Sequence, residues 1–316
     1  MRTYIDTIKE ISTRLLTDGT VDMVIGYKAG TIPMMTTPVA ARDAADVEQL
    51  VWNSHCCANL ANYLMDSKEK VAVIAKRCDC RSIVNHIAEG KVKREDVVII
   101  GVPCTGMVDR HIITTCFDSE IDEVVEKDDG TIVVQGDEGE KQYQKAELLR
   151  QNCKVCIQRN PVLYDEIVAD PVEEPTDTDR FEEVEKIEAL GVDDRWQHFE
   201  ELISTCIRCY ACRDSCPTCY CPTCFVDEAQ PQWVGKSDDQ PDVMTFHILR
   251  AFHTAGRCTD CGACVSACPM GIDMRAFTKK LEKDCLDLWG WEAGQAADVR
   301  PALETYQPDD PEENIK

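Results

Sequence analysis

The chain has 316 residues, enough for two or three domains, and its 44% apolar content can supply a globular core. Its formal net charge of −24 opposes binding to a phosphate backbone, so no nucleic-acid partner is expected. The twenty cysteines stand at short spacings, which predicts metal ligands or disulfides rather than scattered core thiols.

The N-terminal segment helps to decide between thiolate ligands and disulfides. Asp6, Lys9, Glu10 and Arg14 interrupt its apolar residues, which is typical of an amphipathic helix and not of a signal peptide. No segment reaches the ~18–20 apolar residues that a membrane span requires. We therefore expect a cytoplasmic protein without a transmembrane segment, whose reduced thiols serve as ligands.

The first part of the chain alternates helix-like and strand-like segments. Helices are predicted over residues 5–16, 44–51, 58–65 and 82–89, and strands over 21–27, 71–75 and 97–101. This order predicts an α/β domain with a small parallel sheet. Residues 121–126 and 131–136 flank Asp128-Asp129-Gly130 and predict an antiparallel β-hairpin, which a helix over 145–150 follows.

Prolines and acidic residues after residue 160 predict an extended connection between two domains. We expect an α/β domain over 1–165, an acidic linker over 166–192, a ferredoxin-like α+β module with added helices over 193–290, and an acidic tail over 291–316. Helices over 243–252 and 273–288 should pack around the cysteine loops of that module. His247 and His253 lie six residues apart, so they do not share a helix face and are expected to be ordinary helix residues.

Two cysteine runs near the C-terminus match the full Cys-x2-Cys-x2-Cys-x3-Cys-Pro pattern of bacterial ferredoxins. Three closely spaced cysteines reach three irons of one cubane, while the fourth serves the other cluster. The pattern predicts one [4Fe-4S] cluster on Cys206, Cys209, Cys212 and Cys268, and a second on Cys258, Cys261, Cys264 and Cys216. A zinc site needs only four ligands, so it explains neither the third cysteine of each loop nor the repeated Cys-Pro ending.

Two features depart from a compact ferredoxin. Residues 217–257 separate the two runs, so the crossed ligation is an inference from the pattern. Cys219, Cys221 and Cys224 add three thiols at ligand-like spacing immediately after the first run. These three either bind an additional metal or replace Cys216 as a ligand.

Cysteines of the N-terminal domain follow two of the predicted strands. Cys78 and Cys80 come after the strand at 71–75, and Cys104 follows the strand at 97–101, so they should meet at the carboxyl edge of the sheet. With the pair Cys153 and Cys156 they predict a third [4Fe-4S] cluster, to which Cys104 and either Cys78 or Cys80 contribute. Catalytic thiols and plain buried cysteines are the alternatives, and Cys116 and Cys285 look like single buried thiols.

The sequence contains no Walker loop, no G-x-G-x-x-G, no G-x-S-x-G and no evident histidine–carboxylate pair. A self-contained hydrolase or kinase is therefore not expected. The glycine-containing loops GVPCTG and GYKAGTIP suit either a turn or the approach of a flavin or nucleotide phosphate.

The segments VDMVIGY, KRCDCRSIV, GVPCTG and CKVCIQRNPVLYD, in this order, resemble the beta-subunit family of coenzyme F420-reducing hydrogenases and formate dehydrogenases over residues 10–165. The C-terminal part looks like a two-cluster ferredoxin domain fused to it, similar to iron–sulfur subunits of formate dehydrogenase and heterodisulfide reductase-linked complexes. The resemblance implies an adaptor that passes electrons between iron–sulfur clusters and a flavin or deazaflavin. Residue by residue, the match falls on Cys78, Cys104, Cys153 and Cys156.

These patterns together predict an iron–sulfur electron-transfer subunit of a cytoplasmic anaerobic oxidoreductase complex, such as a hydrogenase, formate dehydrogenase or heterodisulfide reductase-like assembly. Catalysis would take place in partner redox subunits. The alternative is an enzyme proper, whose α/β domain binds FAD and itself oxidises or reduces a deazaflavin or nicotinamide coenzyme. A third reading is a scaffold whose clusters only hold the fold together.

Overall fold

The computed structural model describes residues 3–65, 67–117, 120–127, 129–137 and 139–301. The chain forms two compact units: unit 1 comprises residues 1–80 and 92–178, and unit 2 comprises residues 81–91 and 179–316. Strand β8 (Glu166–Ile167) and helix α7 (Glu182–Glu188) lie in the part of the chain expected to be an acidic linker, residues 166–192. Asp128 of the predicted turn and most of the expected acidic tail lie outside the described residues.

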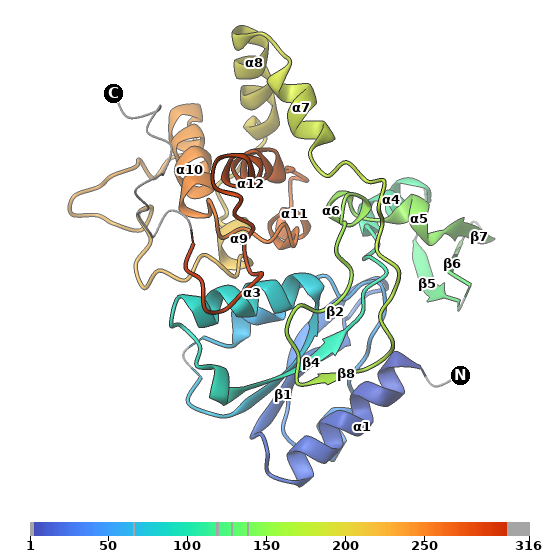
Figure 1. The fold of residues 1–316 in the computed structure, drawn as a ribbon. Helices are drawn as coiled ribbons and strands as arrows, with labels where there is room; N and C mark the ends of the chain where they lie inside the picture. The colour runs from blue at the N-terminus through green and yellow to red at the C-terminus, as the bar shows by residue number, and fades with distance from the viewer. Residues whose placement is uncertain (1–2, 66, 118–119, 128, 138, 302–316) are drawn as a thin grey trace. The chain divides into compact units, whose positions relative to one another are not determined.

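Unit 1 is built on a five-stranded sheet with the order β2-β1-β3-β4-β8. The strands are β1 (Met23–Ala29), β2 (Thr36–Ala41), β3 (Val71–Lys76), β4 (Val97–Val102) and β8. β1, β3 and β4 run parallel, as predicted (Figure 1). β8, which was not predicted, pairs parallel with β4 at one edge, and β2 pairs antiparallel with β1 at the other. β2 was not predicted, because Pro38 is typical of a loop or an edge strand.

The helices of unit 1 follow from local sequence signals. α1 (Tyr4–Thr17) starts with a capping box between Thr3 and Asp6, and it buries Ile8, Ile11 and Leu15. α2 (Ala44–Glu48) and the 3-10 helices Leu60–Tyr63 and Arg94–Asp96 are short, and the first of these 3-10 helices replaces the longer helix expected over 58–65. α3 (Arg77–Ala88) begins immediately after β3, five residues earlier than predicted.

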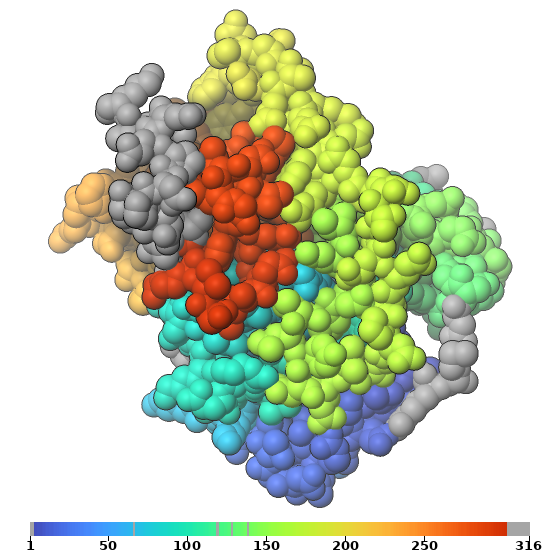
Figure 2. All heavy atoms as spheres, in the orientation of Figure 1, coloured from blue at the N-terminus to red at the C-terminus, as the bar shows by residue number. Residues whose placement is uncertain are grey.

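A second, three-stranded antiparallel sheet in unit 1 confirms the predicted hairpin. β5 (Ile121–Glu126) pairs with β6 (Thr131–Gly136), and β7 (Gly139–Gln144) adds a strand that was not predicted. One apolar core joins this sheet to the short helices α4 (Arg110–Thr115) and α5 (Lys145–Leu148). Figure 1 shows the sheet beside these helices, and Figure 2 shows it as an exposed green lobe.

Unit 2 consists of helices and loops over its described residues. The helices are the second half of α3, α7, α8 (Val192–Ile203), α9 (Ala211–Asp214), α10 (Gln240–His253), α11 (Ala263–Ala267) and α12 (Arg275–Trp289). α10 and α12 agree with the predicted helices, but the described residues contain no strand of the expected α+β module. Phe199, Ile203 and Val243 pack α8 against α10, together with Phe277 of α12. None of the helices in the described ranges is long and apolar enough to cross a membrane.

Candidate metal centre

The two cysteine runs of unit 2 repeat one backbone conformation. Arg208 and Asp260, at the same position of the two runs, have φ values of 48° and 51°. Tyr210 and Gly262 then have φ values of 62° and 68°, and they immediately precede the short helices α9 and α11. Three of these four residues are not glycine, so the left-handed conformation is held against its steric cost in both runs.

This conformation directs backbone N–H groups towards the cysteine sulfurs. The N–H of Arg208 donates to Cys206 Sγ at 3.4 Å, and the N–H of Asp260 donates to the Cys258 thiol in the same way. A thiolate is stabilised by such donors, and hydrogen bonds to the sulfurs adjust the potential of an iron–sulfur cluster. Each loop is therefore shaped to receive anionic sulfur.

The first run shares a cavity with the last cysteine of the second run. Cys206, Cys209, Cys212 and Cys268 line one small hollow, whose walls include Phe246, Ile272 and Met274. The N–H of Ile272 donates to Cys268 Sγ at 3.4 Å. The fold thus brings together the four cysteines that the crossed pattern assigns to one cluster.

The remaining four cysteines of the two runs are also neighbours of one another. Cys264 interacts electrostatically with Cys216 and Cys261, and Cys258 interacts with Cys261. Burial, the largest cause, raises the pKa of the Cys264 thiol to about 12. Without metal this thiol stays protonated at neutral pH, and iron would replace its proton on binding.

The described residues contain no group of three or more histidine, cysteine, aspartate or glutamate side chains arranged to hold a single metal ion. A [4Fe-4S] cubane needs a different arrangement of side chains from a single metal ion, because each of the four cysteine thiolates binds a different iron atom. The shared cavity, the N–H donors and the repeated loops suit such a cluster.

Helix α10 presents two polar side chains to the cysteines. His247 is 3% exposed, and its Nε2 lies 3.3 Å from Cys206 Sγ. Burial first, and then the charges of Arg250 and Arg208, lower the pKa of His247 to about 4. The neutral imidazole donates to Cys206 when that sulfur is a thiolate, so His247 is a neighbour of the site that spacing along the helix did not identify.

Arg250 is the second polar residue of this helix face. It is 4% exposed, and its Nη2 donates to the carbonyl oxygen of Cys212 at 3.0 Å. Its buried Nε has no hydrogen-bond partner among the described residues. Burial alone would lower the pKa of Arg250, but neighbouring cysteines raise it above its usual value. These cysteines are Cys216, Cys264, Cys212 and Cys219. An unpaired buried donor beside thiols fits an anionic group bound at this position.

The additional thiols after the first run lie beside Cys216. Cys219 is hydrogen-bonded to Cys216 and interacts electrostatically with Cys224, whereas Cys221 is exposed. Cys216 Sγ is also 3.1 Å from the Thr218 hydroxyl oxygen. Cys219 therefore lies beside Cys216, and whether it binds metal stays a prediction.

A separate group of thiols lies in unit 1, where three of the predicted residues meet. Cys104 interacts electrostatically with Cys153 and then with Cys156, and burial raises its pKa to about 12. The N–H of Gly106, at φ 100°, donates to Cys104 Sγ at 3.4 Å, which repeats the donor two residues after the cysteine seen in unit 2. The N–H of Met107 donates to Cys153 Sγ at 3.3 Å.

The structure adds Cys57 to this group. Cys57 interacts electrostatically with Cys153, and its Sγ lies 3.9 Å from the carbonyl oxygen of Val108. Cys57 follows no predicted strand and belongs to no Cys-x2-Cys motif. The one signal in the sequence that could have identified it is the adjacent pair Cys56-Cys57.

Cys78 and Cys80 are in the first turn of α3 and not in a loop after β3. Cys80 is fully buried with its Sγ 3.5 Å from the carbonyl oxygen of Ala75, as expected of a core thiol. Cys78 Sγ lies 4.0 Å from Asp79 Oδ1. Lys76 interacts electrostatically with Cys78 and also with Cys104, so Cys78 remains a candidate.

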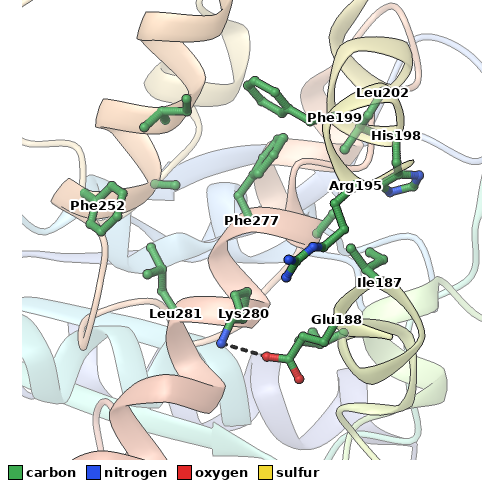
Figure 3. A pocket seen from close by; sticks show the side chains of 14 residues that line it. Ile187, Glu188, Arg195, His198, Phe199, Leu202, Phe252, Phe277, Lys280 and Leu281 are labelled. Atoms are coloured by element: carbon green, nitrogen blue, oxygen red, sulfur yellow. Dashed lines mark ion pairs between the residues drawn. The ribbon is translucent and has the colours of Figure 1, made fainter. Parts of the chain in front are cut away.

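A larger hollow in unit 2 is apolar. Helices α7, α8, α10 and α12 line it with side chains such as Ile187, Phe199, Phe252 and Phe277, and no cysteine is among them. Figure 3 shows Arg195 directed into it and the ion pair between Lys280 and Glu188 at its edge. This hollow is distinct from the cysteine sites.

Known proteins match both parts of the chain. A family model described as the 4Fe-4S binding domain matches residues 253–272, which contain the second cysteine run. The F420-dependent formate dehydrogenase subunit beta of Methanocaldococcus jannaschii is 25% identical over 342 residues, which cover 89% of each chain. The F420-dependent formate dehydrogenase 1 subunit beta of Methanococcus maripaludis is 25% identical over 354 residues, which cover 92% of this chain and 90% of the relative.

The resemblance to the beta-subunit family is confirmed. It extends over almost the whole chain, and not only over residues 10–165. Among solved structures, a chain of the xenon-derivatised F420-reducing [NiFe] hydrogenase complex from Methanosarcina barkeri matches 49% of this chain and 60% of its own length. The TM-score of that match is 0.37 and the identity is 15%.

Proposed function

We infer that this chain is an iron–sulfur electron-transfer subunit of an anaerobic oxidoreductase complex. The observation that carries the inference is the cavity lined by Cys206, Cys209, Cys212 and Cys268, because it joins three cysteines of one ferredoxin run to the last cysteine of the other. The match to a 4Fe-4S binding domain supports the metal, and the beta-subunit relatives support the membership in a complex.

The first [4Fe-4S] cluster is assigned to the four cysteines of that cavity, and the second to Cys258, Cys261, Cys264 and Cys216. A bound cluster supplies one-electron redox chemistry. The chain's own residues hold the thiolates, donate N–H groups to them and exclude water from them. Phe246, Ile272 and Met274 shield the first site.

Unit 1 is assigned a third cluster on Cys104, Cys153 and Cys156, with Cys57 or Cys78 as the fourth ligand. The electrostatic interaction of Cys104 with Cys153 and Cys156 supports this assignment, as does the N–H donor from Gly106. A chain with this many reduced thiols suits a reducing compartment such as the cytoplasm.

The partners we propose are redox subunits that carry the catalytic centres. The relatives are named as beta subunits of F420-dependent formate dehydrogenases, so the electrons would pass between a formate-oxidising subunit and a deazaflavin coenzyme. In the primary proposal this chain only relays them. If unit 1 also binds FAD, the chain would itself exchange hydride with the coenzyme.

The experiment is anaerobic reduction of the purified chain, followed by its electron paramagnetic resonance (EPR) spectrum and by its absorbance with coenzyme F420. A relay shows cluster signals after chemical reduction and does not consume reduced F420 when it is alone. Consumption of F420 with a flavin spectrum would favour the enzyme proper, and the absence of any reducible cluster would overturn the proposed function.

A further inference from the structure

One face of helix α10 contacts the cysteine loops of both runs. Phe246 packs in the same core as Cys212 and Cys268, and His247 contacts the Cys206 sulfur. Arg250, one turn further along, donates to the Cys212 carbonyl oxygen. The guanidinium therefore lies where the two runs approach each other.

The charge of Arg250 has no carboxylate to balance it in the part of the chain that the structure describes. Other buried cations of unit 2 have a carboxylate partner, since Arg275 and Lys279 both pair with Asp260. Arg250 instead has an unpaired buried Nε. Burying a cation without a counter-charge is unfavourable, so an anion is expected beside it.

The groups that can supply this negative charge are the thiolates of the two runs. The thiols that act on Arg250 include Cys212 from the first site, and Cys216 and Cys264 from the second. Among the described cysteines, the one within hydrogen-bonding distance of His247 is Cys206 of the first site. The two residues of α10 are thus expected to affect different numbers of clusters.

We propose that Arg250 is a positive charge shared by both ferredoxin-type clusters, and that it raises the reduction potential of each. Reduction adds an electron, so a nearby fixed cation stabilises the reduced form more than the oxidised form. This role rests on the two clusters of the proposed function. Arg250 binds no iron in this account, and it acts on the redox equilibrium alone.

The test is an EPR-monitored redox titration of the anaerobically purified full chain, with iron and sulfide counted in each sample. Arg250→Gln and Arg250→Met remove the charge, whereas Arg250→Lys keeps it. His247→Phe removes the donor to the first site only. Arg195→Gln removes one exposed charge next to the apolar hollow, away from any cysteine that lines a site.

We expect both neutral Arg250 variants to lower the potentials of two clusters by a tenfold or greater change in the reduction equilibrium, which is 59 mV for a one-electron couple. Arg250→Lys should stay closer to the wild type, His247→Phe should shift one cluster, and Arg195→Gln should shift none.

Several results would overturn the proposal. One is normal iron content with unmoved potentials, or with only one potential moved, in the neutral Arg250 variants. Another is an equal shift of the potentials in Arg250→Lys and Arg250→Met, which would mean that the shift arises from altered packing and not from the lost charge. Loss of a cluster from both neutral variants would make Arg250 a residue that positions the loops. Wild-type protein without clusters would instead refute the proposed function itself.

Discussion

The Nε2 of His247 lies 3.3 Å from the Sγ of Cys206, although the two residues are 41 positions apart in the chain. Cys206 also accepts the N–H of Arg208, so the first ligand of the first run has two donors. Hydrogen bonds to cluster sulfurs stabilise the more negative, reduced state. The segment between the two runs therefore does more than connect them, because its helix supplies polar groups to the cysteines.

His247→Phe should lower the potential of the first cluster and leave the second unchanged. One hydrogen bond of about 1 kcal/mol corresponds to a roughly fivefold change in the reduction equilibrium. Phenylalanine should fit, because His247 already packs against Phe246 and Phe277. His247→Gln keeps a donor and serves as the control in the redox titration. A shift of both clusters in His247→Phe would contradict this assignment.

Crossed ligation predicts which cysteine variants behave alike. Cys206→Ser and Cys268→Ser should weaken the same EPR component, although these residues belong to different runs. Cys258→Ser and Cys216→Ser should weaken the other. Uncrossed ligation would instead pair Cys268→Ser with Cys258→Ser.

Two further serine variants complete this comparison. Cys285→Ser is the control, because Cys285 is a single buried thiol of α12. Cys219→Ser tests whether the Cys219 thiol, and not Cys216, is the cluster ligand. If Cys219→Ser removes the component that Cys216→Ser leaves intact, Cys219 is the ligand.

The thiols of unit 1 should hold about four irons of their own. Cys104→Ser, Cys153→Ser and Cys156→Ser should each lose that iron without changing the ferredoxin-type signals. Comparing Cys57→Ser with Cys78→Ser by iron analysis identifies the fourth ligand, and the electrostatic interaction of Cys57 with Cys153 favours Cys57. Cys80→Ser should keep full iron content, and iron unchanged by all of these variants would rule out the third cluster.

Glu126 links the second sheet to the loop that carries Cys57. Its carboxylate accepts the Ser54 N–H at 3.1 Å and pairs with Lys145 at 2.7 Å. Burial alone would raise the pKa of Glu126, but Lys145 and Ser54 hold it below the usual value. A depressed carboxyl pKa gives stability that is present above the unfolded-state pKa and is lost as the pH falls through the folded-state pKa.

Glu126→Gln should therefore lower the free energy of unfolding by up to about 1 kcal/mol, because the pair is partly exposed. The difference should be constant from pH 8 to pH 5 and should shrink below about pH 4, where glutamate becomes protonated. Urea denaturation of both proteins across this range measures it, with exposed Glu123→Gln as the matched control. A difference that disappears between pH 8 and pH 5 would contradict this explanation.

Much of the fold could be predicted because its signals are local. The alternating segments gave the parallel strands β1, β3 and β4, and the two period-two segments gave the hairpin of β5 and β6. β2 and β7 were not predicted, since Pro38 in one and the polar residues of GEKQYQ in the other resemble loops. Strands of this kind are stabilised by neighbours that the local sequence does not reveal.

The candidate sites divide in the same way. Spacing alone predicted the eight ferredoxin-type cysteines, because their pattern is contiguous. Cys57, His247 and Arg250 reach their sites only through tertiary packing, so no spacing rule could identify them. Cys78 and Cys80 illustrate the opposite difficulty: their position after a strand suggested a loop, but α3 starts directly at Arg77 and turns Cys80 into the core.

Iron and acid-labile sulfide, counted per chain in anaerobically purified protein, test the central claim most directly. Two clusters in unit 2 require about eight irons and eight sulfides per chain, and a third cluster in unit 1 would raise each total to about twelve. Cys268→Ser should lose iron from the cluster that Cys206 also holds. Zinc in place of iron, or fewer than about four irons per chain, would contradict the assignment of this protein as a two-cluster electron relay.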